Sequence, residues 1–188
     1  MIESLDFIRG RNIVLRPVLE GDLNQTYLSW LNDPLTNEWS ERRCFPTSQQ
    51  EMRSFFESDS RSRLLLAITV NTKHVGNILL SDIDFFHRRA ELSILVGDRD
   101  QWGTGVGAEA IYLLTRHAFT VLELNRLYAG TISPAVVMIF RKLHWQHEGT
   151  RKEDVFRNGN FVDSHEFAIL ANTFCKESDY EHDSEMAE

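Results

Sequence analysis

Three alternate glycines lie where a strand-like run of this chain turns into a helix-like run. The stretch is Asp100–Ala110, DQWGTGVGAEA, with Gly103, Gly105 and Gly107. A run rich in β-formers, residues 90–96, precedes it, and apolar residues at helical spacing follow it. Glycine lets an anion approach the main chain, and the unpaired first N–H groups of a helix attract negative charge. The stretch therefore predicts a pyrophosphate cradle, although a tight turn alone would also use glycine.

Two other anion-binding motifs compete with this interpretation. A P-loop requires Gly-Lys-Ser/Thr, and here Gly107 is followed by Ala108 and Glu109, which excludes it. The dinucleotide-binding motif fits in relaxed form from Gly103 to Ala108, with Glu123 twenty residues beyond its first glycine. Because Glu123 precedes a strand-like run instead of ending one, and the motif stands in mid-chain, dinucleotide binding is kept as the minor alternative.

Several motifs, taken in order, resemble the GNAT N-acetyltransferases, especially the branch that acts on ribosomal proteins and amino sugars. The segment WGTGVGAEA is similar to the family's acetyl-coenzyme A loop, with Trp102 where Arg or Gln is usual. Further similar segments are GRNIVLRPVLEGDL, YLSWLNDP, HVGNILL, HRRAELSILVG and LNRLYAG, so the resemblance covers about residues 10–170. It implies an α/β (α+β) fold: a mixed, largely antiparallel twisted sheet of about seven strands flanked by helices.

Periodicity and turn residues predict the order of the elements. Asp22 is the expected N-cap of a first helix, and Thr47 with Gln50 has capping-box spacing for a second. The helix after the glycines crosses over to the next strand, which predicts parallel pairing there. Pro134 suits the first turn of a last helix, and Asn158-Gly159 predicts a hairpin. The expected strands are residues 12–18, 63–70, 75–81, 90–96, 126–132, 149–157 and 161–170.

Composition fits one domain of residues 1–175. The 188 residues, 42% of them apolar, can bury one core. Residues 176–188 hold six acids and one base, which gives −5 of the net charge of −8, and we expect a solvated, disordered tail there. The isolated Cys44 and Cys175 suit reduced thiols and a cytoplasmic location. Without an apolar run of about 18 residues or a basic stripe, we expect neither membrane nor nucleic-acid binding.

The resemblance implies that acetyl-coenzyme A is the cosubstrate. Its pantetheine arm is an amide chain that can pair with a strand edge as a peptide does, and backbone N–H groups there could stabilise the thioester oxygen. A metal site is not expected, because His144 and His147 lack a third ligand nearby. In the family, coenzyme A binds the strand before the loop and the loop itself, which here are Ser93, Ile94, Leu95, Val96, Trp102, Gly103, Thr104, Gly105, Val106 and Gly107.

The resemblance places the general base at Glu91, within the strand before the loop. Apolar neighbours raise the pKa of a carboxylate, which suits a group that accepts the proton of the attacking amine. The alternative is that Glu91 forms an ion pair with Arg88 or Arg89 on an exposed sheet face.

Other positions depart from the family pattern. The tyrosine that protonates the departing thiolate is replaced by Phe140, which leaves Ser133, Tyr128 or water as the proton donor. The family's closing Gly-Phe appears as His144-Trp145. A coenzyme A-binding module that has lost catalysis therefore stays an alternative to an active enzyme.

We expect the acceptor to be a small-molecule primary amine. Within the branch that the sequence resembles, the first choice is an amino group of a nucleotide-linked sugar, and the nearest rival is a protein N-terminal amine, as on ribosomal proteins. The candidate substrate residues are Trp39, Arg42, His87 and Arg88. Homodimers are common in the family, and the sequence leaves the assembly open.

Overall fold

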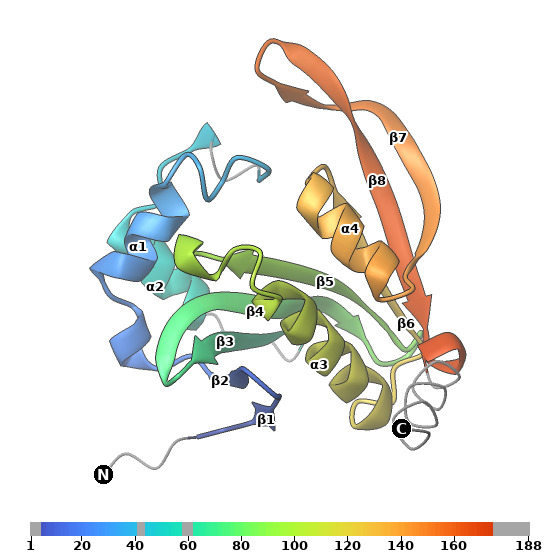
Figure 1. Cartoon of the computed structure of the whole chain (residues 1–188), viewed down its shortest axis with the longest axis horizontal. Coiled ribbons are helices and arrows are strands. Elements are labelled where there is room, and N and C mark those ends of the chain that lie inside the picture. Colours follow the sequence, from blue (N-terminus) through green and yellow to red (C-terminus); the bar gives the residue numbers. More distant parts are fainter. Residues whose placement is uncertain (1–4, 41–43, 58–61, 175–188) are drawn as a thin grey trace. The chain divides into compact units, whose positions relative to one another are not determined.

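The computed structural model describes residues 5–40, 44–57 and 62–174 (Figure 1). The chain forms two compact units. The first comprises the described residues of Met1–Ser81 and Ser93–Leu114, and the second those of Asp82–Leu92 and Thr115–Glu188. The expected single domain of residues 1–175 stays a prediction, and Cys175 and the acidic segment 176–188 lie outside the described residues.

The first unit contains antiparallel strands in the order β1-β2-β3-β4, together with the Ser93–Val96 part of β5, which follows β4 in the sheet order. Asn71 and Thr72 join β3 to β4 with φ of 48° and 68°, which is the backbone of a tight hairpin turn between two strands that the sequence predicts. The two-residue strand β1 is an addition to the predicted set. The bounds are β1 Ile8–Arg9, β2 Val14–Pro17, β3 Leu64–Val70, β4 Lys73–Asp84 and β5 Arg89–Val96.

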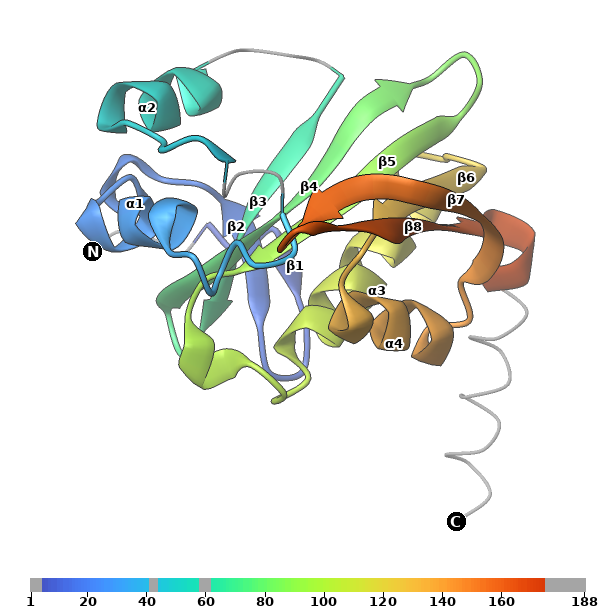
Figure 2. The same cartoon turned by 90° about the horizontal axis from the view of Figure 1, so that it is seen from above.

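Two helices, α1 (Gln25–Asn32) and α2 (Gln49–Glu57), also belong to the first unit and lie beside each other (Figures 1 and 2). Tyr27 and Trp30 of α1 are buried with Met52 of α2 in a common apolar cluster. Apolar residues three and four apart share one helix face, so α1 turns one apolar face toward this cluster.

Both predicted N-caps are wrong by one or two residues. Asn24, not Asp22, caps α1 by accepting a hydrogen bond from the Tyr27 N–H at 3.1 Å. Asp22 instead ends a short 3-10 turn, and its carboxylate accepts a hydrogen bond from the Arg16 guanidinium at 2.6 Å. At α2, Ser48 forms the capping box in place of Thr47.

The capping box of α2 is reciprocal. The Ser48 N–H donates to the Glu51 carboxylate at 2.7 Å, and the Glu51 N–H donates to the Ser48 hydroxyl at 3.2 Å. The residue pattern is therefore the expected one, shifted by one position along the chain.

The second unit is built on the strand order β5-β6-β8-β7. Strand β6 (Arg126–Thr131) is parallel to β5 over three residue pairs, which confirms the predicted crossover. Strands β7 (Gln146–Arg157) and β8 (Asn160–Leu170) form the long hairpin drawn in orange in Figure 1. Its turn is Asn158-Gly159 with φ of 48° and 82°, as predicted.

Helix α3 (Val106–Thr120) runs from the first unit into the second, and α4 (Pro134–Lys142) lies in the second. Pro134 occupies the first turn of α4, as expected. The Phe140 ring on α4 is buried against Phe167 of β8, with 5.4 Å between ring centroids. The mixed, largely antiparallel sheet with flanking helices confirms the expected fold class. Among the described residues, no helix is long and apolar enough to span a membrane.

Candidate active site

The glycine stretch forms an exposed loop between β5 and α3, as predicted. A 3-10 turn, Arg99–Gln101, leads into it, and α3 begins at Val106. Gly103 and Gly105 have φ of +75° and +94°, which an L-residue with a side chain adopts only under strain. A Cβ at either position would meet open space within 4 Å, so the loop surface is free for a ligand to approach.

The start of α3 can hold an anion. The Glu109 N–H bonds back to the Gly105 carbonyl at 3.0 Å, so the N–H groups from Val106 to Ala108 precede the first helical hydrogen bond. The helix dipole adds positive potential at this end. These groups fit the pyrophosphate of coenzyme A without a covalent or metal partner.

The Glu109 side chain fixes this helix end to the N-terminal strands. Its carboxylate accepts from the main-chain N–H groups of Arg11 at 2.5 Å and Asn12 at 2.9 Å. Gly10 gives it room, since a Cβ there would lie 2.3 Å from the Glu109 carboxylate. The sequence analysis did not single out this anchor, because its partners are main-chain groups 97 and 98 residues away.

The proposed pantetheine strand ends beside the loop. Ser93 is exposed and Ile94, Leu95 and Val96 are half-buried. The Trp102 indole N–H donates to the Val96 carbonyl at 2.8 Å. The predicted cofactor residues 93–96 and 102–107 thus belong to one unit and are linked by a hydrogen bond.

Glu91 lies on β5, two residues before Ser93, and its side chain is half-buried. Burial raises the pKa of the Glu91 carboxyl, and the nearby charges of Asp82 and Glu166 raise it further, whereas Arg151 lowers it. A raised pKa is suited to a group that must take a proton near neutral pH.

The alternative ion pair of Glu91 with an arginine is not formed. The Arg88 guanidinium donates to the Glu123 carbonyl, and Arg89 lies 3.8 Å from the Asp84 carboxylate. Both arginines therefore have other partners, which leaves the Glu91 carboxylate in an acidic surrounding.

Tyr128 on β6 is the register partner of Glu91 on β5. Burial raises the pKa of the Tyr128 phenol, and the charges of Glu91 and Asp82 raise it further. The phenol is therefore protonated at neutral pH and can donate a hydrogen bond. Tyr128 is half-buried, so it is not the fully packed core ring that a strand tyrosine often is.

Ser133 is the N-cap of α4. Its hydroxyl accepts from the Val136 N–H at 3.4 Å, and its side chain is buried. This gives Ser133 a structural task, and its role as proton donor stays a prediction. Phe140 is 1% exposed and stacks on Trp145 with 4.5 Å between centroids, so its replacement of the family's tyrosine is accommodated as core packing.

The turn after α4 keeps its usual backbone although histidine replaces the glycine that the family has at this position. His144 adopts φ of 58°, and the Trp145 N–H donates to the Phe140 carbonyl at 2.8 Å. This 6→1 bond is the one that usually closes a helix with glycine in the left-handed position. The departure from Gly-Phe at His144-Trp145 therefore leaves the backbone of this turn unchanged.

Three of the four candidate substrate residues belong to the described residues, and they lie on two separate segments. His87 and Arg88 lie in the turn before β5, where the Arg88 carbonyl also accepts from Asn125 at 2.7 Å. This contact and the bond to Glu123 favour a structural role for Arg88. Trp39 is 38% exposed in the segment between α1 and α2, and Arg42 lies outside the described residues.

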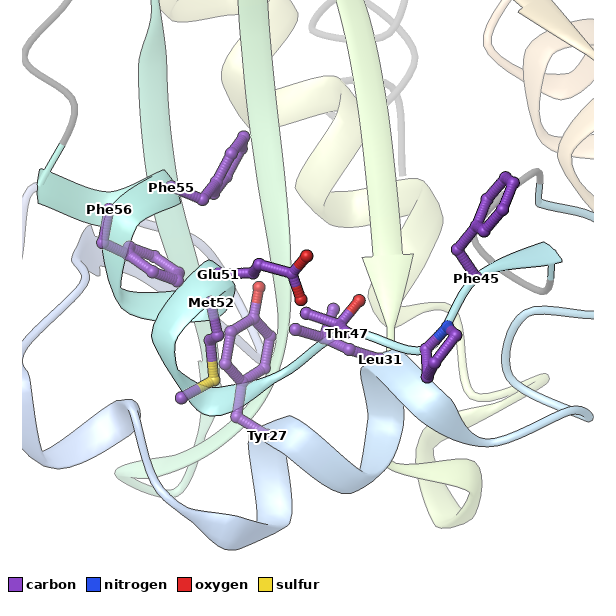
Figure 3. A pocket seen from close by; sticks show the side chains of 9 residues that line it. Tyr27, Leu31, Phe45, Thr47, Glu51, Met52, Phe55 and Phe56 are labelled. Atoms are coloured by element: carbon purple, nitrogen blue, oxygen red, sulfur yellow. The ribbon is translucent and has the colours of Figure 1, made fainter.

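An aromatic cavity of about 310 Å³ opens in the first unit, between α1, α2 and the segment before α2 (Figure 3). Figure 3 shows the Glu51 carboxylate pointing into this space beside the Tyr27 ring. None of the described residues that line the cavity was among the acceptor residues expected from the sequence, which in this region were Trp39 and Arg42. The cavity is lined by Tyr27, Leu31, Phe45, Pro46, Thr47, Glu51, Met52, Phe55 and Phe56.

Among the described residues, no group of three or more His, Cys, Asp or Glu side chains could hold a metal ion. Cys44 is a free, exposed thiol.

Comparison with known proteins identifies the family. Residues 12–135 match the model of the acetyltransferase (GNAT) domain, so this chain belongs to the GNAT family. It is an N-acetyltransferase with acetyl-CoA as its cosubstrate. The minor alternative, dinucleotide binding, is thereby overturned.

The similar proteins are named for acceptors of two kinds, a polyamine and a ribosomal protein. Spermidine N(1)-acetyltransferase of Vibrio cholerae is 24% identical over 170 residues, which cover 89% of this chain and 98% of the relative. The crystal structure of spermidine N-acetyltransferase from that organism with CoA and spermine superposes with a TM-score of 0.78 at 21% identity, covering 87% and 98% of the two chains. RimL, a ribosomal L7/L12 α-N-protein acetyltransferase solved with CoA, gives 0.74 at 17% identity, covering 86% and 95%.

Proposed function

We propose that this enzyme transfers an acetyl group to a primary amine of an aliphatic polyamine, with Glu91 as the general base. The observation that carries the proposal is the half-buried Glu91 carboxyl of raised pKa, set on the strand that leads into the glycine loop. Acetyl-CoA supplies the acetyl group and a thiolate leaving group. In the proposal it is held by strand residues 93–96 and loop residues 102–107.

Each residue has a defined task in this scheme. The N–H groups at the start of α3 bind the pyrophosphate. The Glu91 carboxylate removes the proton from the acceptor ammonium or amine, directly or through one water, because only a neutral amine can attack. The Tyr128 phenol and the Ser133 hydroxyl are the groups proposed to hold a proton for the leaving sulfur.

The charge around Glu91 favours a cationic acceptor. Among the groups whose charges shift the Glu91 pKa, Asp82 and Glu166 are carboxylates, and Arg151 is a cation that is itself bound to Glu166 at 2.6 Å. Such a surrounding attracts a polyamine and repels the diphosphate of a sugar nucleotide. Arg88, which the sequence assigned to the substrate, bonds instead to a main-chain carbonyl.

The relatives support the same choice of acceptor. Spermidine acetyltransferases match nearly the whole chain, and the RimL structure keeps a protein N-terminus as the second candidate. The amino group of a nucleotide-linked sugar, the first choice from sequence, finds no support in the charges around Glu91.

An acceptor screen tests the proposal. Thiol release from acetyl-CoA would be measured with spermidine, spermine, a nucleotide-linked amino sugar and the N-terminal peptide of a ribosomal protein. We expect the polyamines to give the highest kcat/KM. Faster turnover of the sugar or peptide would refute the acceptor assignment, and tight CoA binding without turnover of any amine would favour a module that has lost catalysis.

A further inference from the structure

The peptide group that ends β5 is held from two opposite sides. The Gly97 N–H donates to the Val75 carbonyl of β4 at 2.9 Å. The described peptide bonds are all trans, so the Val96 carbonyl points the opposite way, where the Trp102 indole N–H donates to it at 2.8 Å. This single peptide group therefore links β4, β5 and the glycine loop.

Trp30 fixes the same peptide group from a third direction. A Cβ on Gly97 would lie 2.1 Å from the Trp30 ring, so the ring takes the space that any side chain at this position would need. The reason for glycine here is close approach, in contrast to Gly103 and Gly105, where it is a positive φ. The end of β5 is consequently a rigid base for the loop that follows.

The hydrogen bonds that the structure shows within the glycine loop lie at its start. The Trp102 N–H donates to the Arg99 carbonyl at 3.0 Å, and Thr104 donates to the Gln101 carbonyl from its N–H at 3.4 Å and from its hydroxyl at 2.8 Å. A loop with two glycines of positive φ loses much conformational freedom when it is ordered around a ligand. An anchor that orders it beforehand lowers this cost and tightens binding.

We propose that Trp102 is the positioning residue of the cofactor loop: its indole N–H, bound to the Val96 carbonyl, holds residues 103–107 in the shape that receives the pyrophosphate. The inference rests on the proposed cofactor site. It explains how the chain dispenses with the Arg or Gln usual at this position, because the indole supplies an N–H donor. Trp102 acts on the phosphates only through the main chain.

Two substitutions separate the N–H group from the ring. Trp102→Phe keeps an aromatic ring and removes the donor. Trp102→Gln removes the ring and keeps an N–H donor four bonds from Cα, as in tryptophan. Loss of one hydrogen bond in Trp102→Phe should weaken CoA binding, measured by calorimetry, about two- to tenfold, and Trp102→Gln should recover most of this loss.

Two further measurements separate loop positioning from a general defect. Hydrogen exchange of the free protein should accelerate in residues 99–107 of Trp102→Phe and stay unchanged elsewhere. With acetyl-pantetheine, which lacks the pyrophosphate, kcat/KM of Trp102→Phe should stay within about twofold of the wild type, since the loop then has no phosphate to hold.

Three results would overturn the inference: Trp102→Phe binding CoA as the wild type does, Trp102→Gln binding as weakly as Trp102→Phe, or an equal loss with acetyl-pantetheine. A wild-type protein that does not bind CoA would instead refute the proposed cofactor site on which the inference rests.

Discussion

Glu91 and Tyr128 are register partners on the parallel strands β5 and β6, and burial, together with nearby carboxylates, raises the pKa of both side chains. The pair lies where the parallel pairing ends, directly before the strand residues proposed to bind pantetheine. A carboxyl group that takes up protons readily and a phenol that keeps its proton are the two kinds of group that an acetyl transfer uses.

The stability of the protein should depend on Glu91. Its folded pKa is raised above the ordinary value, so the folded state binds a proton more tightly than the unfolded state. The stabilising contribution is full below the ordinary pKa and is lost as pH rises through the folded pKa. We expect Glu91→Gln to unfold at a higher temperature than the wild type near pH 8.

At about pH 3, well below the ordinary pKa of a glutamate, this difference should vanish, because Glu91 is then protonated in both states. Scanning calorimetry at both pH values measures it. Glu153→Gln, an exposed change on β7, is the control and should leave the melting temperature unaltered. If Glu91→Gln were no more stable than the wild type at high pH, burial of the ionised Glu91 carboxylate would not destabilise the folded state.

Neighbouring charges should set the pH dependence of the rate. Asp82→Asn removes a like charge and should lower the Glu91 pKa, which moves the acid limb of the kcat/KM profile to lower pH. Arg151→Gln should move the same limb to higher pH, because the cation that stabilises the carboxylate is gone. Shifts in the same direction for both variants would contradict Glu91 as the titrating base.

The positive φ angles predict which glycines the loop needs. Gly105→Ala forces an alanine into φ of +94° and should cost about 1–2 kcal/mol, paid in part as weaker CoA binding. Gly21→Ala is the matched control, since a Cβ there also meets open space and the backbone carries no positive φ. Equal CoA dissociation constants for the two variants would argue against a required loop conformation.

Restoring the family's tyrosine should not restore a proton donor. Phe140 is 1% exposed and packs between Trp145 and Phe167, so Phe140→Tyr would bury a hydroxyl among rings. We expect a loss of about 1–3 kcal/mol in unfolding free energy and no gain in kcat. Denaturant unfolding and steady-state kinetics decide this, and a faster enzyme of unchanged stability would show that the hydroxyl reaches the leaving sulfur.

Much of the fold could be predicted because its signals are local. Asn158-Gly159 and Pro134 act through their own backbone preferences, and both lie where the sequence predicted. The first cap was misplaced because the Asp22 carboxylate accepts a hydrogen bond from Arg16, and no capping pattern in the sequence indicates this contact. The capping box at Ser48 lies one residue after the predicted one at Thr47.

The site was predictable to the extent that it resides in one stretch of chain. The position of the glycine loop follows from its motif, and Glu91 was indicated by the family resemblance, with its role as base still a proposal. The acidic neighbours of Glu91 come from strands β4 and β8, and the Glu109 anchor binds main-chain groups near the N-terminus. Such partners are brought together only by folding, and the same holds for the contact of Trp30 with Gly97.

The most direct test of the account is single-turnover acetylation of spermidine by Glu91→Gln, with CoA affinity measured on the same preparation. We predict that the chemical step slows by about 10²- to 10⁴-fold while the CoA dissociation constant stays at its wild-type value. An undiminished rate with intact CoA binding would contradict the central claim that Glu91 takes the proton of the attacking amine.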